Sequence, residues 1–369
     1  MNKNMILFNA TFVSEDKIDG FVRYTLEILK RIKKENILFV TNRKIIEKYN
    51  LSNYIEVPLE LSEDNRKANI KRLLWYQTKL NHYIDKYNIK VFYSPIPEGI
   101  IFPSVKQIIT IHDIIPLIYP KYHRRFKYYY KYLLKIMVKN SSKIITVSEN
   151  SKKAILETYN LKKENIFIAS PSIDKSKFYP RDKTSINETI KKYRLKDKYI
   201  LYVGVIRIYK NVERLIRAFN KINRKDVDLV IIGKFNKNTL YLKDLVKDLG
   251  IEDNVKFIEF VPDEDLTNLL SGASLFVLPS LYEGFGIPPL EAMACGTPVV
   301  VSKIGSLTEV CGNASYYVNP YDIDDIAKGL NIVLTDEKLR EELIRKGFER
   351  IKKFSWENTV KTIEKIIGI

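Results

Sequence analysis

Residues 277–300 read VLPSLYEGFGIPPLEAMACGTPVV, and the predicted architecture follows from this segment. The apolar run Leu275–Leu278 is typical of a buried parallel strand. Glycines follow in Glu283–Gly286, and Pro288 stands at an expected helix start, where proline loses no needed N–H. A second apolar run, Val299–Val301, comes next. This order of strand, glycine loop, helix and strand predicts a parallel α/β sheet with an anion- and sugar-binding pocket at its carboxyl edge.

Two carboxylates, Glu283 and Glu291, flank the glycines of this loop. Because Pro288 interrupts a continuous helix through both, we place Glu283 in the loop and Glu291 in the first helical turn. From these positions the two acids would converge on one ligand. In the alternative interpretation, Glu291 only complements the helix dipole and Glu283 is a solvated turn residue. The surrounding GFGIPPL and AMACGTPVV favour the ligand-binding interpretation.

The same segment resembles the signature of the family-four retaining glycosyltransferases of the GT-B fold, which include bacterial mannosyltransferases of cell-surface polysaccharide synthesis. The family's paired glutamates, with GFG between them, match Glu283 and Glu291. The resemblance implies two Rossmann-like domains facing each other across a cleft. It also implies transfer of a hexose from a nucleotide diphosphate sugar with retained anomeric configuration. Glu283 would then hold hexose hydroxyls and Glu291 the ribose hydroxyls. The diphosphate would meet backbone amides of Gly284, Phe285, Gly286 and Ile287.

The length of 369 residues predicts two domains. We expect an N-terminal acceptor-side domain at 1–172 and a nucleotide-sugar domain at 173–353, with the proline-bounded segment 171–180 as the hinge. The resemblance implies that a terminal helix in 354–369 crosses back onto the first domain. The N-terminus lacks a signal-peptide pattern, and no apolar run approaches the roughly 18–20 residues of a membrane span. A cytoplasmic enzyme is therefore expected.

The net charge of +18 is unevenly distributed. Residues 1–180 carry 32 basic and 17 acidic residues, whereas the remaining 189 carry 30 and 27. The partner that responds to charge should therefore dock on the first half. Nucleic acid, an anionic membrane and a lipid-diphosphate acceptor all fit this asymmetry.

Residues 121–143 contain eight Lys and Arg and no Asp or Glu. Tyrosines and aliphatic residues recur among these cations at helical spacing. Such a basic helix is a candidate for peripheral contact with the inner face of the plasma membrane, because tyrosine suits the headgroup layer and lysine stems snorkel. The alternative is an ordinary helix that packs its tyrosines on the sheet and solvates its lysines.

Other candidate residues follow predicted strands. His112 and Asp113 come directly after one, at the usual ligand side of an open α/β sheet. The residues alone also allow a capped turn histidine. The resemblance implies that His112 reaches the transferred sugar and that Asp113 orients the turn. After the predicted strand Met5–Asn9, a loop leads to Gly20 and Arg23, which the resemblance makes candidates for an acceptor- and donor-contacting cleft loop.

A pair of cations follows the predicted strand Ile200–Val203 and Gly204. Arg207 and Lys210 lie between this strand and the next helix, where positive charge suits the diphosphate of a departing leaving group. Relatives place a lysine six residues after this glycine, as Lys210 is here. The chain departs from the family pattern at Tyr209, where relatives often have arginine.

Metal and cofactor chemistry finds little support in the sequence. The Asp-x-Asp strings at 263–265 and 322–324 follow prolines and precede apolar helical runs, which is typical of helix N-caps. We therefore expect no metal site. A GT-B phosphorylase would need a lysine carrying pyridoxal phosphate, and no motif calls for one.

The sequence therefore predicts a glycosyltransferase without cofactor. We expect it to move mannose from GDP-mannose to a glycan or lipid-linked acceptor in cell-envelope polysaccharide or lipopolysaccharide synthesis. A UDP-hexose such as UDP-glucose is the alternative donor. A basic nucleic-acid-binding protein is the alternative of another class, but it gives the paired glutamates no role, so no nucleic-acid partner is expected.

Overall fold

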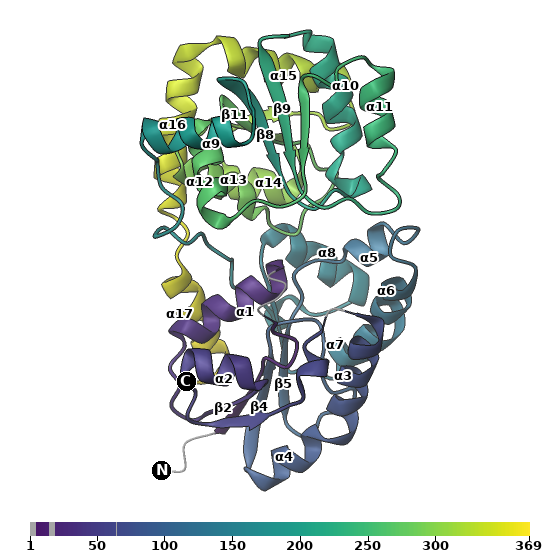
Figure 1. Ribbon diagram of the computed structural model, residues 1–369. Coiled ribbons are helices and arrows are strands. Elements are labelled where there is room, and N and C mark those ends of the chain that lie inside the picture. The colour runs from purple at the N-terminus through teal and green to yellow at the C-terminus, as the bar shows by residue number, and fades with distance from the viewer. Residues whose placement is uncertain (1–4, 15–18, 64) are drawn as a thin grey trace. The chain divides into compact units, whose positions relative to one another are not determined.

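The computed structural model describes residues 5–14, 19–63 and 65–369 (Figure 1). The chain divides into two compact units. The first combines Met1–Pro171 with Ser355–Ile369, and the second is Ser172–Phe354. Each unit is a parallel sheet flanked by helices, so the predicted α/β class with two Rossmann-like domains is confirmed.

The first unit is built on a seven-stranded sheet in the order β3-β2-β1-β4-β5-β6-β7. The order reverses between β1 and β4, and such a switch point is where open α/β sheets bind ligands. The predicted first strand is confirmed at its full length. The strands are β1 (Met5–Asn9), β2 (Ile37–Thr41), β3 (Tyr54–Glu56), β4 (Ile89–Ser94), β5 (Lys106–Thr110), β6 (Lys143–Thr146) and β7 (Ile166–Ile168).

Helices of the first unit connect these parallel strands, and the last helix of the chain joins them. In that helix, the Glu364 carboxylate accepts from the Lys33 amide at 2.9 Å, and Trp356 packs edge-on against Tyr24. The helices are α1 (Gly20–Arg31), α2 (Arg43–Tyr49), α3 (Arg66–Thr78), α4 (Leu80–Lys86), α5 (Ile115–Ile118), α6 (Arg124–Tyr128), α7 (Leu134–Lys139), α8 (Glu149–Tyr159) and α17 (Trp356–Ile367).

Within the basic segment 121–143, residues 124–139 form one helical run with a change of winding in its middle, and Lys143 already belongs to β6. A π-helical turn, Tyr129–Leu133, joins α6 to α7. One side of this run is part of the core, where Tyr130, Leu134 and Val138 pack with residues of β5, β6 and α8. The turn inserts an extra residue per winding and therefore changes which side chains face the sheet.

The second unit contains a six-stranded sheet in the order β10-β9-β8-β11-β12-β13, with its switch point between β8 and β11. The predicted strand Leu275–Leu278 is confirmed as β11, and all four of its residues are buried, which explains its continuous apolar run. The strands are β8 (Lys198–Val203), β9 (Val227–Ile232), β10 (Val255–Ile258), β11 (Leu275–Leu278), β12 (Val299–Ser302) and β13 (Tyr316–Val318).

The helices of the second unit follow the strands in the βαβ manner. They are α9 (Lys183–Lys192), α10 (Val212–Ile222), α11 (Leu242–Asp248), α12 (Asp263–Gly272), α13 (Ile287–Ala294), α14 (Gly305–Cys311), α15 (Ile323–Thr335) and α16 (Glu337–Ile351). One of the Asp-x-Asp strings acts as a cap, because the Asp322 side chain accepts from the amides of Asp324 and Asp325. The other string lies in the first turn of α12, where Asp263 pairs with Lys177 at 2.9 Å. Among the described residues, no helix is both long and apolar enough to pass through a bilayer.

Candidate functional site

The loop that leaves β11 at the switch point of the second unit ends at Gly286. This residue has φ of 106°, and a Cβ on it would lie 2.6 Å from Leu307 Cδ2, so the position requires glycine. The left-handed residue lets α13 begin at Ile287, with prolines at the next two positions. The predicted place of Glu291 in the first helical turn is therefore wrong, because it is the fifth residue of α13.

Glu283 forms a buried ion pair with Lys210. The Lys210 Nζ lies 2.6 Å from Oε1 and 2.8 Å from Oε2 of Glu283, and the Ser280 hydroxyl donates to Oε1 at 2.6 Å. The side chains of Lys210 and Glu283 are only 17% and 8% exposed. Removing two charges from water costs several kcal/mol per ion, so such a pair contributes orientation rather than much stability.

The loops that carry this pair are also joined through their backbones. The Leu281 amide donates to the Tyr209 carbonyl at 2.7 Å. Asn211 Nδ2 donates to the carbonyls of Pro279, at 2.9 Å, and Pro320, at 2.7 Å. Asn211 is buried and has φ of 62°, which asparagine tolerates better than most residues. These bonds fix the turn that follows β8 against the loop that follows β11.

Sequence reasoning missed the residues that support Glu283. Ser280 lies only three residues before it, and that spacing was a usable signal. Asn211 offered a weaker one, as an asparagine immediately before a helix. Ser306 donates to the Glu283 carbonyl at 2.8 Å from the first turn of α14, and no local pattern points to it.

The other predicted donor residues have distinct surroundings. Arg207 is exposed, and it lines a cavity of about 270 Å³ with Arg214 and Arg217. It precedes the short 3₁₀ turn Ile208–Lys210 that carries Lys210. Of the two predicted cations, the structure thus places Lys210 on Glu283.

Phe285 is a packing residue in this structure. Its ring is buried edge-on against Phe354 with centroids 5.7 Å apart, so only its backbone is suited to contact a ligand. At the start of α13, Pro288 and Pro289 carry no N–H. The orphan donors of this helix end are therefore the amides of Gly286 and Ile287.

Glu291 is also buried, with 4% of its surface exposed, and it lies on α13 while Glu283 lies in the loop. One turn further along, burial raises the pKa of the Cys295 thiol, a hydrogen bond with Ser271 lowers it, and the Glu291 charge raises it by a smaller amount. Burial raises the pKa of Cys295 to about 12, so this thiol is kept protonated and unreactive.

His112 belongs to the first unit, two residues after β5. Its Nε2 lies 3.0 Å from the Pro95 carbonyl oxygen, and its ring packs edge-on against Phe21 and Tyr24, each at 4.8 Å. A carbonyl only accepts, so Nε2 carries the proton and Nδ1 is an acceptor. Burial lowers the pKa of His112 to about 4, against the opposite effects of the Pro95 carbonyl and Asp19. The imidazole is therefore neutral at pH 7.

The remaining candidates also belong to the first unit. Asp113 Oδ1 accepts from the Ile115 amide at 2.9 Å, which is the turn-orienting role expected of it. Gly20 is the first residue of α1, and a Cβ there would meet nothing within 4 Å. Arg23 lies half-buried in the same first turn, which Asp19 caps by accepting from the Val22 amide at 2.9 Å.

The buried ion pair predicts a specific pattern of stability. Lys210→Met leaves the Glu283 carboxylate buried without its cation and should lower the free energy of unfolding by about 3–5 kcal/mol. The double variant Lys210→Met/Glu283→Gln should recover most of this loss, because no uncompensated charge remains. Urea unfolding of wild type, both single variants and the double variant measures the coupling. A Lys210→Met protein as stable as wild type would contradict the buried pair.

The buried His112 predicts that the free energy of unfolding falls as the pH is lowered. Its folded-state pKa of about 4 lies below the unfolded value of about 6.5, so its contribution is fully present above pH 6.5 and is lost as the pH falls toward 4. Between pH 7 and pH 5, wild type should lose about 2 kcal/mol more unfolding free energy than His112→Gln. Denaturant titrations of both proteins at the two pH values measure the difference. Parallel pH slopes would show that His112 is not held neutral by burial.

Comparisons with known proteins agree with this architecture. Residues 18–177 match the model described as Glycosyltransferase Family 4, and residues 185–350 match Glycosyl transferases group 1. The O-antigen chain mannosyltransferase B of Escherichia coli is 30% identical over 97% of this chain and 98% of its own. The O-antigen chain mannosyltransferase RfbU of Salmonella typhimurium strain LT2 is 34% identical over 73% of this chain and 72% of its own.

The fold is likewise shared with solved structures. Anabaena HepE, crystallised in complex with UDP-glucose, superposes with a TM-score of 0.74 at 17% identity and covers 99% of this chain and 100% of its own. At that identity the likeness shows the fold, which is GT-B. The near full-length match to a mannosyltransferase shows the family. The chain belongs to the glycosyltransferases of group 1 and family 4, and it is a hexosyltransferase.

Proposed function

We propose that this glycosyltransferase transfers mannose from GDP-mannose to a glycan or lipid-linked acceptor in cell-envelope polysaccharide synthesis. The observation that carries the proposal is the buried Lys210–Glu283 pair at the switch point of the second sheet, where such folds bind nucleotides. The choice of mannose rests on the relatives, two of which are named O-antigen chain mannosyltransferases.

The hydrogen-bond capacity of this pair suits a sugar diphosphate. A lysine ammonium has three donors, and Lys210 directs it at both oxygens of Glu283, which leaves a donor for a phosphate oxygen. Glu283 Oε1 takes bonds from Lys210 and Ser280, while Oε2 takes one from Lys210 and keeps acceptor capacity for hexose hydroxyls. Lys210 would thus stand where the hexose joins its diphosphate.

Other residues of the second unit complete the donor site. Glu291 would accept from the ribose hydroxyls, as acidic residues do in related nucleotide-binding sheets. The amides of Gly284, Phe285, Gly286 and Ile287 would face the diphosphate, as would the exposed Arg207. Negative charge that develops on the leaving phosphate is stabilised by cations and N–H groups already in place, so we propose that the enzyme needs neither a metal nor a cofactor.

We propose that the anomeric configuration is retained. The acceptor hydroxyl attacks the face from which the nucleoside diphosphate departs, and a leaving phosphate oxygen takes the hydroxyl proton. The bond from the anomeric carbon to the phosphate oxygen breaks while the new glycosidic bond forms. This route needs no carboxylate nucleophile, which agrees with Glu283 being committed to Lys210 and Ser280. His112 would accept a hydrogen bond from a hydroxyl of the transferred sugar through Nδ1, with Gly20 and Arg23 in the loop toward the acceptor.

A UDP-hexose is the second candidate donor, because the structural neighbour Anabaena HepE was solved with UDP-glucose. Thermal-shift titration with GDP-mannose and UDP-glucose separates the two. We expect GDP-mannose to raise the melting temperature more, and Glu291→Gln to remove most of that shift. Glu337→Gln, an exposed acid of α16, is the matched control and should bind like wild type. Unchanged donor affinity in Glu291→Gln would contradict the ribose assignment, and the absence of a shift with either donor would contradict the proposed function.

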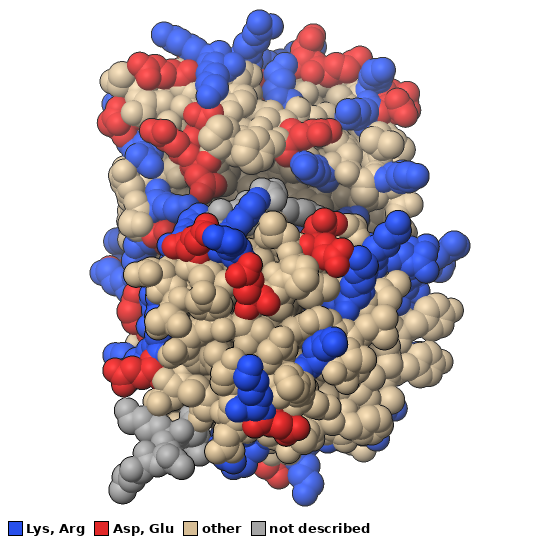
Figure 2. Space-filling model, turned by 60° about the horizontal axis from the view of Figure 1, so that its bottom comes forward, with Lys and Arg blue, Asp and Glu red and all other residues tan. Residues whose placement is uncertain are grey.

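We further propose that the helical run 124–139 contacts an anionic membrane surface at the cytoplasmic face. Tyr128 and Tyr132 are 58% and 54% exposed. Other residues of the run form its buried side, so these two tyrosines are not part of the core. Their rings stack 6.4 Å apart, with the ammonium groups of Lys127 and Lys131 5.4 and 5.3 Å from them. A tyrosine pair directed outward among lysines, and not onto the sheet, favours the membrane interpretation. In Figure 2, one face of the molecule shows basic side chains beside exposed uncharged ones.

Vesicle flotation tests this contact. The wild-type protein should float with vesicles that contain anionic lipid at low salt and should be released at high salt. Replacing Lys127, Lys131 and Lys135 by Gln should weaken binding roughly a hundredfold, at about 1 kcal/mol per lysine. The matched control replaces Lys225, Lys338 and Lys352 of the second unit by Gln. Wild-type protein that stays in solution at low salt would contradict the membrane proposal.

A further inference from the structure

The first unit contains a cavity of about 430 Å³ that none of the donor residues lines. It lies beside the switch point between β1 and β4, at the carboxyl edge of the sheet. Its volume falls in the range of roughly 300–1,000 Å³ that is usual for small-molecule sites. Aromatic side chains line one part of it, and polar side chains line another. The aromatic ones are Phe12, Phe21, Phe126, Tyr129 and Tyr130.

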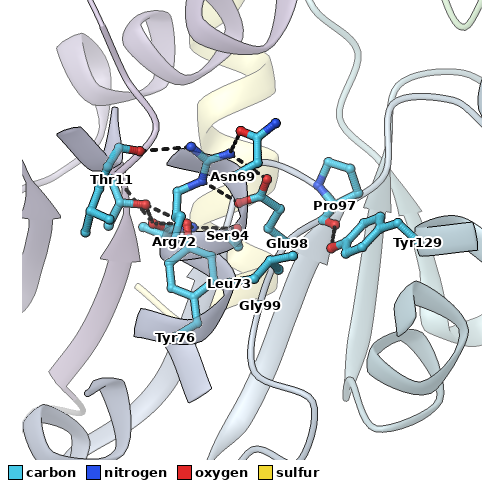
Figure 3. A network of polar contacts seen from close by, with 12 residues as sticks. Thr11, Asn69, Arg72, Leu73, Tyr76, Ser94, Pro97, Glu98, Gly99 and Tyr129 are labelled. Atoms are coloured by element: carbon cyan, nitrogen blue, oxygen red, sulfur yellow. Dashed lines mark hydrogen bonds and ion pairs between the residues drawn. The ribbon is translucent and has the colours of Figure 1, made fainter. Parts of the chain in front are cut away.

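The polar part is built around a buried ion pair. Arg72 is 5% exposed and donates through Nε and Nη2 to the two oxygens of Glu98, at 2.6 and 2.7 Å (Figure 3). Its Nη1 donates to the Leu61 carbonyl at 2.9 Å. The guanidinium charge is therefore matched by one carboxylate in a bidentate arrangement, and four of its five N–H groups donate within the protein.

Arg72 also fixes the orientation of Asn69. Its Nη2 donates to Asn69 Oδ1 at 2.9 Å. Because a guanidinium only donates, the amide oxygen must face Arg72, and the amide nitrogen points away from it, as Figure 3 shows. Asn69 thus offers N–H donors, while the Asp19 and Glu63 carboxylates offer acceptors among the lining residues. Sugar hydroxyls both donate and accept, so they match this mixture.

The wall formed by residues 95–101 is held in place before any ligand binds. The Pro95 carbonyl accepts from His112. The Pro97 carbonyl accepts from the Tyr129 hydroxyl at 2.5 Å, and the Gly99 carbonyl accepts from the Gln77 side chain at 3.0 Å. Side chains from α3, from the π-helical turn and from the loop after β5 therefore hold this short loop in place. A wall that is already rigid spares a ligand the entropy of ordering it.

We propose that this cavity binds an uncharged pyranose residue at the end of a glycan acceptor, and not the diphosphate of a lipid carrier. Among the described residues that line it, three carboxylates, Asp19, Glu63 and Glu98, face one guanidinium, which Glu98 already neutralises. A diphosphate would meet excess negative charge there. A pyranose would place its C–H face on the aromatic rings and its hydroxyls on the polar groups.

This inference rests on the proposed function. It divides the strongly basic first half into an outer surface that attracts phosphate and a cavity that takes a sugar. Of the six basic residues in 124–139, five are exposed and Lys127 is half-buried, and none of them is among the described residues that line the cavity. Phe126 belongs to both surfaces, because it lines the cavity and is 50% exposed. A carrier phosphate would therefore be attracted along the outside of this helical run, while the sugar end enters the cavity.

Saturation-transfer NMR tests the proposal with methyl α-D-mannopyranoside and α-D-mannose 1-phosphate as probes. The variants are Phe126→Ala and the matched control Phe102→Ala. Phe102 is 75% exposed in the same unit and does not line the cavity, so both substitutions spare the core. The quantity measured is the difference in each probe's saturation-transfer signal between wild type and Phe126→Ala.

We expect Phe126→Ala to weaken binding of the methyl glycoside by roughly two- to tenfold, the usual range for losing one aromatic contact. Phe102→Ala should bind like wild type, and mannose 1-phosphate should give no Phe126-dependent signal. The proposal is overturned if wild type and Phe126→Ala bind the methyl glycoside equally, if wild type does not bind it, or if mannose 1-phosphate gives the larger Phe126-dependent signal.

Donor titration on the same samples distinguishes this failure from failure of the proposed function. Phe126 lies in the first unit and the donor residues lie in the second, so Phe126→Ala should keep the wild-type shift with nucleotide sugar. A normal donor shift with no Phe126-dependent sugar binding overturns the cavity assignment alone. Phe126-dependent sugar binding without any donor shift overturns the donor assignment and supports the cavity.

Discussion

The ion pair between Lys210 and Glu283 is the interaction on which the second unit's site depends. It joins the turn after β8 to the loop after β11, the two strands where the sheet changes direction. Both charges are largely removed from water, so the pair stabilises the fold little and fixes geometry instead. Ser280 and Asn211 hold the surrounding loops, so the carboxylate is oriented before a ligand arrives. A preoriented acid beside a cation is the arrangement that a neutral sugar attached to an anionic diphosphate requires.

Sequence reasoning succeeded where the structure is local. Fully buried strands such as β1 and β11 appear as short apolar runs, and both were predicted with their observed bounds. The ligand site predicted from the spacing of Glu283 and Glu291 stays a prediction. The helix start was displaced because Gly286 takes a left-handed conformation, which places Ile287, and not a proline, at the first helical position. Glycine permits that conformation without requiring it, so the sequence alone could not fix the boundary.

Contacts between distant segments could not be predicted in the same way. Lys210 and Glu283 were both candidates, but they are 73 residues apart, and their pairing depends on β8 and β11 being neighbours in the sheet. The same holds for the Arg72–Glu98 pair, which joins α3 to the loop after β4 and belongs to no recognisable motif. His112 was predicted as a sugar contact. That contact stays a prediction, and the structure shows one of the two ring nitrogens in a hydrogen bond with the Pro95 carbonyl.

The π-helical turn Tyr129–Leu133 has a consequence for how this region tolerates change. A π turn carries one residue more than a regular winding, and each residue of a helix accounts for about 100° of rotation. The extra residue is therefore absorbed within a single turn, and deleting it would restore regular winding while Leu134 and Val138 of α7 keep facing the core. Inserting a further residue would instead turn α7 by about 100° about its axis. This segment should therefore tolerate the loss of one residue better than the gain of one.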